Sequence, residues 1–290
     1  MKKITLLVAA LAFVMFNVQA QEDLVSKKGF KILPEAGDYA FGVDFAPFIK
    51  TVNLNASNTA PSFDLADGLA IFGKYYTTDD MAYRVKFAFN RNSETRKNYV
   101  RDESLLVITP ENQIADKGTF SYAQFALSVG FEKRRGQGRL QGYYGADLFF
   151  MYNDGNAANQ NFSSEYGNEF SSTITNPDHT AYVAPKNGFR TANVDQGAQF
   201  GVGARAFVGA EYFIAPKISI GGELGWGVAY AAGFDGEQTD EEWDNVDLKV
   251  KSTTVKTGNN SGFVVGSDGA SNTFNGWTGL GGNINLIFHF

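Results

Sequence analysis

The sequence of 290 residues contains no cysteine. Disulfide bonds are therefore excluded, and no cysteine follows the N-terminal apolar segment to carry a lipid anchor. Beyond the N-terminus, no segment reaches the roughly 18 consecutive apolar residues that a transmembrane helix needs. Mean hydropathy is also slightly negative. These absences argue against a helical membrane protein and leave the location of the chain to other signals.

The N-terminus predicts export from the cytoplasm. Lys2 and Lys3 precede an apolar core at residues 4–16, and Val18-Gln19-Ala20 matches a small-x-small cleavage site. This pattern is typical of a secretory signal peptide, here residues 1–20. The alternative is a membrane anchor, but a core of about 13 residues is too short to span a bilayer. Cleavage would remove two lysines and no acid, changing the net charge from −6 to −8. This balance argues against nucleic-acid binding.

Apolar and polar side chains alternate along most of the remaining sequence, as they do in β-strands. In residues 81–92, for example, Tyr83 and Val85 alternate with Arg84 and Lys86. The predicted strands are about 10–16 residues long, which exceeds the usual 5–6 residues and suits a tilted membrane-spanning strand. The eight predicted strands are residues 38–49, 68–77, 81–92, 119–133, 139–152, 199–213, 217–232 and the closing stretch 276–290.

The connections between these strands alternate between long and short. The long ones are residues 50–67, 93–118, 153–198 and 233–275, and the short ones lie around residues 78–80, 134–138 and 214–216. Bacterial outer-membrane barrels have short periplasmic turns and longer outer loops. The sequence therefore predicts an all-β, eight-stranded antiparallel up-and-down transmembrane β-barrel over residues 38–290, with four long extracellular loops. Residues 21–37 are predicted to form a short periplasmic N-terminal segment.

One face of each predicted strand is aliphatic and aromatic, and the other carries small and charged residues. An eight-stranded barrel has room only for filling side chains, so the aromatic face is predicted to contact lipid and the charged face to line the lumen. Aromatic residues near strand ends would form interfacial girdles: Tyr39, Tyr83, Tyr152, Tyr212, Tyr230 and Trp277.

The lumen is predicted to hold five acids and four bases: Asp44, Lys74, Arg84, Lys86, Glu132, Asp147, Arg205, Glu211 and Glu223. Pairing through a turn at Ala215 would put Arg205 opposite Gly225 and diagonal to Glu223. A balanced set of charges in a narrow space should form ion pairs. We expect a plugged lumen, and the alternative is a gated conduit.

The end of the sequence carries a family resemblance. Ile284, Leu286, Phe288 and Phe290 alternate up to a terminal aromatic residue, which resembles the assembly signal of Gram-negative outer-membrane proteins. The chain as a whole resembles the small eight-stranded OmpA-barrel and OmpX-like group. This resemblance implies a cell outer-membrane location and recognition by the barrel-assembly machinery and periplasmic chaperones. It also implies contact with outer-membrane lipid and lipopolysaccharide, and with other outer-membrane proteins.

Catalytic and metal-binding motifs are weak. His179 with Ser171 or Ser172 could belong to a lipid hydrolase, but no G-x-S-x-G motif supports a nucleophile. The acidic residues 235–247 lack the alternating pattern of a calcium loop, so a solvated loop is favoured. Residues 246–255 alternate again and are interpreted as loop structure above the membrane. The rival is a further strand pair with residues 262–265.

The sequence thus predicts a non-enzymatic outer-membrane protein without a cofactor or bound metal. Its expected roles are envelope structure, surface interaction or a subunit role in an outer-membrane assembly. A narrow porin-like channel for small solutes and a lipid-A-modifying enzyme are the alternatives.

Overall fold

A computed structural model describes residues 24–44, 69–102, 111–136, 138–155, 159–168, 189–259, 261–267 and 283–290. The predicted signal peptide and the 50–67 connection lie outside these residues. Within them, no helix is long and apolar enough to cross a membrane. The described strands are β1 (Tyr39–Asp44), β2 (Leu69–Thr78), β3 (Met81–Arg101), β4 (Gln113–Arg135), β5 (Leu140–Asp154), β6 (Asn161–Glu165), β7 (Phe189–Asp195), β8 (Ala198–Ala215), β9 (Ile218–Gly233), β10 (Gly236–Asp244), β11 (Lys249–Thr257), β12 (Gly262–Ser267) and β13 (Asn283–His289).

Eight of these strands form a closed antiparallel ring in the order β1-β2-β3-β4-β5-β8-β9-β13. The last strand returns to the first, because Phe41 of β1 lies opposite Phe288 of β13. Tyr39 and Phe290 exchange backbone hydrogen bonds of 3.1 and 2.8 Å at the end of this seam. Each strand of the ring corresponds to one predicted strand, so the all-β class and the eight-stranded antiparallel ring are confirmed.

Side chains alternate between the inside and the outside of the ring. In β3, Arg84 and Lys86 are buried whereas Tyr83 and Val85 are exposed. The outside is correspondingly apolar over many strands, as shown by Leu148 on β5, which is 65% exposed. Five of the six predicted girdle residues, Tyr39, Tyr83, Tyr152, Tyr212 and Tyr230, are also exposed. The sixth, Trp277, lies outside the described residues.

One end of the ring, the turn end, carries the short connections and the N-terminal segment. Ile32 and Leu33 are buried against Phe213 of β8. The backbone N–H of Lys217 donates to the carbonyl of Ile32 at 3.1 Å, and the amide of Ala36 donates to the Asp79 carboxylate at 2.8 Å. The segment before β1 therefore packs across the turn end, which its irregular sequence did not predict.

At the opposite end, the loop end, the structure corrects the predicted connections. Strands β3 and β4 continue into residues 93–118, and β6 and β7 lie within residues 153–198. Most of residues 246–255 are not loop structure: residues 246–248 form a turn, but the rest belong to β11, which pairs with β10 over nine residue pairs. Residues 262–265 belong to a strand, β12, which pairs with β9 and not with β11. These strands were missed because their sequences lack the wide apolar face of the ring strands.

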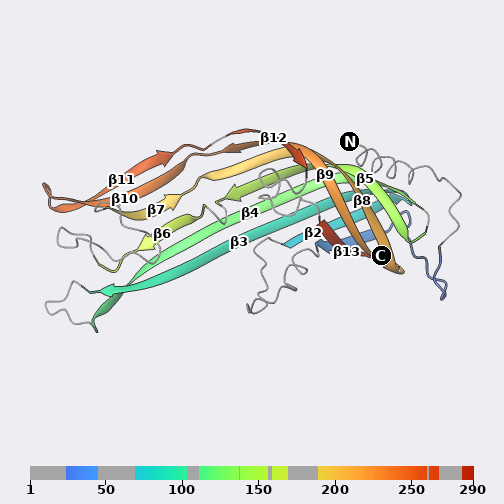
Figure 1. Ribbon diagram of the computed structural model, residues 1–290, viewed down its shortest axis with the longest axis horizontal. Helices are drawn as coiled ribbons and strands as arrows, with labels where there is room; N and C mark the ends of the chain where they lie inside the picture. The colour runs from blue at the N-terminus through green and yellow to red at the C-terminus, as the bar shows by residue number, and fades with distance from the viewer. Residues whose placement is uncertain are drawn as a thin grey trace, which may run out of the picture.

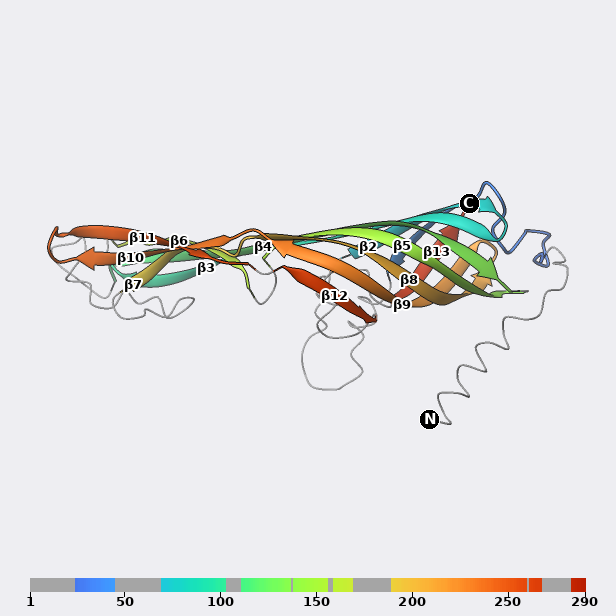
Figure 2. The same ribbon diagram turned by 90° about the horizontal axis from the view of Figure 1, so that it is seen from above.

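The additional strands build a sheet that projects from the ring. Its strand order is β3-β4-β6-β7-β10-β11. We call the part that projects from the ring the blade; it consists of β3 after residue 90, β4 up to residue 123, and strands β6, β7, β10 and β11. Figure 1 shows the blade extending away from the ring, and Figure 2 shows that it is a single thin layer of strands. The β3–β4 pair runs without a register shift from Met81–Lys133 in the ring to Arg101–Gln113 at the far end. One uninterrupted hairpin therefore connects the ring to the blade.

Candidate functional site

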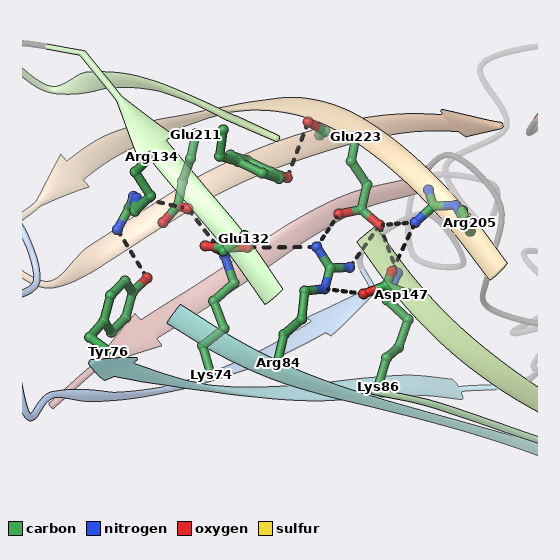
Figure 3. A network of polar contacts seen from close by, with 12 residues as sticks. Lys74, Tyr76, Arg84, Lys86, Glu132, Arg134, Asp147, Arg205, Glu211 and Glu223 are labelled. Atoms are coloured by element: carbon green, nitrogen blue, oxygen red, sulfur yellow. Dashed lines mark hydrogen bonds and ion pairs between the residues drawn. The ribbon is translucent and has the colours of Figure 1, made fainter. Parts of the chain in front are cut away.

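The inside of the ring holds a connected set of ion pairs, here called the interior network. Its members come from β2, β3, β4, β5, β8 and β9, and strand alternation directs their side chains inward. Figure 3 shows them converging from facing walls of the ring. The charged members are Lys74, Arg84, Lys86, Glu132, Arg134, Asp147, Arg205, Glu211 and Glu223.

Glu223 of β9 is the first hub of the interior network. Its carboxylate accepts two hydrogen bonds from Arg84, at 2.9 and 3.0 Å. Lys86 donates to the same group at 2.9 Å, and Arg205 donates at 3.1 Å. A bidentate arginine pair is among the strongest charge-assisted contacts in proteins. One carboxylate thus compensates three buried cations.

Glu211 of β8 is the second hub. Lys74 lies 3.5 Å and Arg134 lies 3.1 Å from its carboxylate oxygen Oε2. The other oxygen accepts a hydrogen bond from the Ser219 hydroxyl and lies 2.9 Å from Nε2 of His289. The closing strand β13 is therefore tied to the interior as well as to its neighbours.

Glu132 of β4 joins the two hubs. Lys74 lies 2.8 Å from its Oε1, and Arg84 lies 3.6 Å from its Oε2. Arg84 also reaches Asp147 at 3.2 Å. This reach depends on Gly130, which lies between Arg84 and Asp147 in the register, because a Cβ there would lie 2.3 Å from the Asp147 carboxylate. The charged groups thus form one network and not separate pairs.

Aromatic rings fill the spaces between the charges. The Arg84 guanidinium lies 4.1 Å from the centre of the Phe207 ring, and the Lys74 ammonium lies 5.0 Å from that of Tyr143. Such cation–π contacts gain strength when the cation is desolvated. Arg134 donates to the Tyr76 hydroxyl at 2.9 Å. The cations are therefore held by ring faces as well as by carboxylates.

The interior network is buried and nearly balanced in charge. Its four acids face five permanent cations, and each of these nine residues exposes 5% of its surface or less. Buried charges require both a partner and additional hydrogen bonds. The low exposure means that these groups are covered almost completely by protein atoms. The described interior therefore has the character of a packed polar core.

The structure brings together eight of the nine predicted lumen residues. The exception is Asp44, whose backbone pairs with Asn285 at the end of β1 and whose side chain is not described. Sequence reasoning missed Arg134, which was assigned to a turn, although it follows Glu132 by two residues and shares its face. Tyr76 and Ser219 lay on the inward face by the same alternation but were not recognised as hydrogen-bonding partners.

The predicted register of the β8–β9 hairpin was wrong by two residues. Arg205 lies opposite Gly227, not Gly225. The reason is an irregularity between Phe213 and Ala215 and a turn at Pro216 and Lys217, where Lys217 has a φ of 60°. The long arginine side chain nevertheless reaches Glu223.

The buried group of Ser219, His289 and Glu211 is not arranged as a catalytic relay. Ser219 and Glu211 both contact Nε2 of His289, at 3.1 and 2.9 Å, whereas a relay requires them on opposite ring nitrogens. All three side chains are buried. The predicted candidates His179, Ser171 and Ser172 lie outside the described residues.

The acidic residues 235–247 form β10 and the turn after it, rather than an irregular loop. The backbone N–H groups of Val246 and Asp247 donate to the Asp244 carboxylate and hold its pKa below the ordinary value. Within the described ranges, no cluster of three or more potential metal ligands occurs.

Fold and interior together define a class of protein. A closed antiparallel ring with charges inside and aliphatic and aromatic side chains outside has the side-chain distribution of transmembrane β-barrels. No protein-family model matches the sequence, and no curated protein matches it. A solved structure that it resembles is the crystal structure of the outer membrane protein OprG from Pseudomonas aeruginosa. The match covers 89% of this chain and 98% of the other at 11% identity, with a TM-score of 0.33. Such a distant likeness carries no conclusion about this chain.

Proposed function

We propose that this protein is a non-enzymatic outer-membrane β-barrel with a plugged lumen, which serves envelope structure and surface interaction. The observation that supports this proposal is the inversion of the two faces of the ring. Leu148 and Leu224 are more than 60% exposed on the outside, whereas Glu132 and Glu211 expose nothing. In water this distribution would be unstable, because each Å² of apolar surface removed from water lowers the free energy by about 25 cal/mol. In a bilayer the same surface contacts acyl chains.

Closure of the ring supports a membrane location in a second way. Backbone N–H and C=O groups that face lipid must be paired within the protein, since no water is available. The β1–β13 seam pairs residues 40–44 with residues 285–289. The ring thus has no open edge at the turn end, where β13 and β1 meet.

Packing on both sides of the interior network supports a plugged lumen. Toward the loop end, Phe149 and Met151 follow Asp147 on the inner face and are buried against Ala88 and Ala126. Toward the turn end, Tyr76 and Phe213 are fully buried, and the N-terminal segment covers Phe213. A pore would require the network and both packed layers to move apart.

The proposed orientation places the turn end in the periplasm and the blade outside the cell. Short turns on the periplasmic side and long extensions outside are the common arrangement of such barrels. In this orientation the blade is available for other surface molecules. Biogenesis would then require the barrel-assembly machinery and periplasmic chaperones.

Two measurements on the full chain test the proposal. Fractionation of cells should recover the protein in outer membranes, in a form whose gel mobility changes on heating. Recovery as a soluble periplasmic protein would overturn the membrane assignment. Planar-bilayer recording of the purified protein should show no steady conductance. A steady, sizeable conductance would replace the plugged barrel with the narrow channel for small solutes.

A further inference from the structure

We propose that the outward face of the β3–β4–β6 part of the blade binds the phosphorylated sugar head group of a glycolipid whose acyl chains contact the ring below. This inference rests on the proposed membrane location. It identifies the chemistry of one surface partner, and it follows from how side chains change along one continuous face.

The face can be followed from lipid to blade because the β3–β4 register is unbroken. On the ring, the outward pairs from Tyr83 opposite Phe131 to Phe89 opposite Phe125 are apolar or aromatic. Two residues further along β3 the same face carries Arg91. Since antiparallel strands keep alternate residues on one face, no side chain changes sides at this point. The polarity of the surface changes over a single step.

Beyond Arg91 the face consists of hydroxyl groups between cations. Ser93 lies opposite Ser121, and Thr95 lies opposite Thr119, with their hydroxyls 3.1 Å apart in the second pair. The next pair is Lys97 opposite Lys117. The order along the face is therefore apolar, cationic, hydroxyl-rich and cationic. A glycolipid with acyl chains below a phosphorylated sugar presents the complementary order.

The opposed lysines indicate that an anion belongs here. Like charges directly across an antiparallel pair destabilise the sheet. Lys117 is compensated by Glu165, 2.9 Å away, and Asp154, an acid on the neighbouring strand β5, accepts a hydrogen bond from Asn161. Within the described ranges, Arg91 and Lys97 have no acidic partner. Two phosphate groups, one at each end of the hydroxyl segment, would compensate these two cations through charge-assisted hydrogen bonds.

The row of hydroxyls, with one amide side chain at Asn193, continues across the whole blade and provides further sugar-binding surface. Successive cross-strand pairs connect Thr95, Thr119, Ser163, Asn193, Thr239 and Thr254. On the opposite face of the same strands, the Phe120 and Phe162 rings pack with their centres 5.0 Å apart, and Arg96 pairs with Glu94 at 2.9 Å. The outward face thus differs in carrying an unbroken row of polar side chains, whereas the opposite face combines aromatic rings with an internal ion pair.

Lipid binding to the purified, folded protein tests this inference. The probes are lipid A with two phosphates, its dephosphorylated form, and phosphatidylglycerol, an anionic lipid without that sugar. Affinities can be measured by native mass spectrometry in detergent. We expect the phosphorylated glycolipid to bind at least about tenfold more tightly than either other lipid. Tenfold corresponds to about 1.4 kcal/mol, which the loss of one charge-assisted hydrogen bond would account for.

Variants locate the binding surface. The double variant Arg91→Gln with Lys97→Gln should lose this preference, and Thr95→Val with Thr119→Val should weaken glycolipid binding but not phosphatidylglycerol binding. The matched control is Lys133→Gln with Arg135→Gln, two outward cations of the same hairpin at the turn end, which should keep the preference. Equal affinity for the three lipids, or equal losses in test and control variants, would overturn the inference. Heat-dependent gel mobility reports insertion separately, so failure of the barrel proposal is recognised independently.

Discussion

Neutralising the hub residue Glu223 should destabilise the protein strongly. Glu223→Gln preserves the side-chain volume but removes the charge that compensates Arg84, Lys86 and Arg205. Removing one partner of a buried ion pair costs about 3–5 kcal/mol, because the other charge remains buried without compensation. With three cations affected, we expect at least that loss in the free energy of unfolding. The assay is denaturant unfolding in lipid vesicles, followed by tryptophan fluorescence, which Trp226 on the same strand provides.

The matched control for this prediction is Glu165→Gln. Glu165 also pairs with a lysine at 2.9 Å, but its side chain is 76% exposed. An exposed pair contributes about 0–1 kcal/mol. Adding Lys86→Met to Glu223→Gln should recover part of the loss, since one uncompensated cation is then removed. If Glu223→Gln costs no more than Glu165→Gln, the interior is hydrated and our description of it as a packed polar core is refuted.

Three further predictions concern other parts of the chain. Gly130→Ala should lower the free energy of unfolding by about 1–3 kcal/mol through overpacking, because the new Cβ would lie 2.2 Å from the Ala146 carbonyl oxygen. Gly73→Ala should be tolerated in the same unfolding assay, because the atom nearest to its new Cβ lies 3.7 Å away. Phe290→Asp should lower the amount of heat-modifiable protein in outer membranes several-fold, whereas Val246→Asp at the blade tip should not; normal levels of the Phe290 variant would remove the assembly-signal hypothesis. The pKa of Asp244 is lowered by the N–H groups of Val246 and Asp247. The contribution of this carboxylate to stability is therefore present above the unfolded-state pKa of about 3.9 and is lost as pH falls through the folded-state pKa. An NMR titration showing an ordinary pKa for Asp244 would contradict this contact.

The alternation of side chains made the ring predictable from the sequence. A period of two identifies both the strand and its inward face, so Arg84, Lys86 and Glu132 could be assigned to the interior without coordinates. Eight such strands with alternating connections then specify an even antiparallel ring. This reasoning is reliable where one face is clearly apolar, because a slip of one residue would reverse every side chain.

The blade could not be predicted in the same way. Strand β11 has nine exposed residues in succession, so no burial pattern separates it from a polar loop. Its structure depends on pairing with β10, which is a long-range contact that hydropathy does not report. Contacts between facing walls of the ring, such as Arg84 with Glu223, were equally hidden. Strand order gives neighbouring strands but not the pairs that meet across the interior.

The most direct test of the closed ring is a disulfide across the β1–β13 seam. The chain has no cysteine of its own, so Phe41→Cys with Phe288→Cys introduces one unique pair. Paired antiparallel residues have Cα atoms about 4.5–5.5 Å apart, which a disulfide can bridge. The control is Phe41→Cys with Tyr212→Cys on β8, three strands away around the ring. After oxidation in isolated outer membranes, we predict an intrachain cross-link for the seam pair alone. Cross-linking of the seam pair no greater than that of the control would show that the ring is open in the membrane.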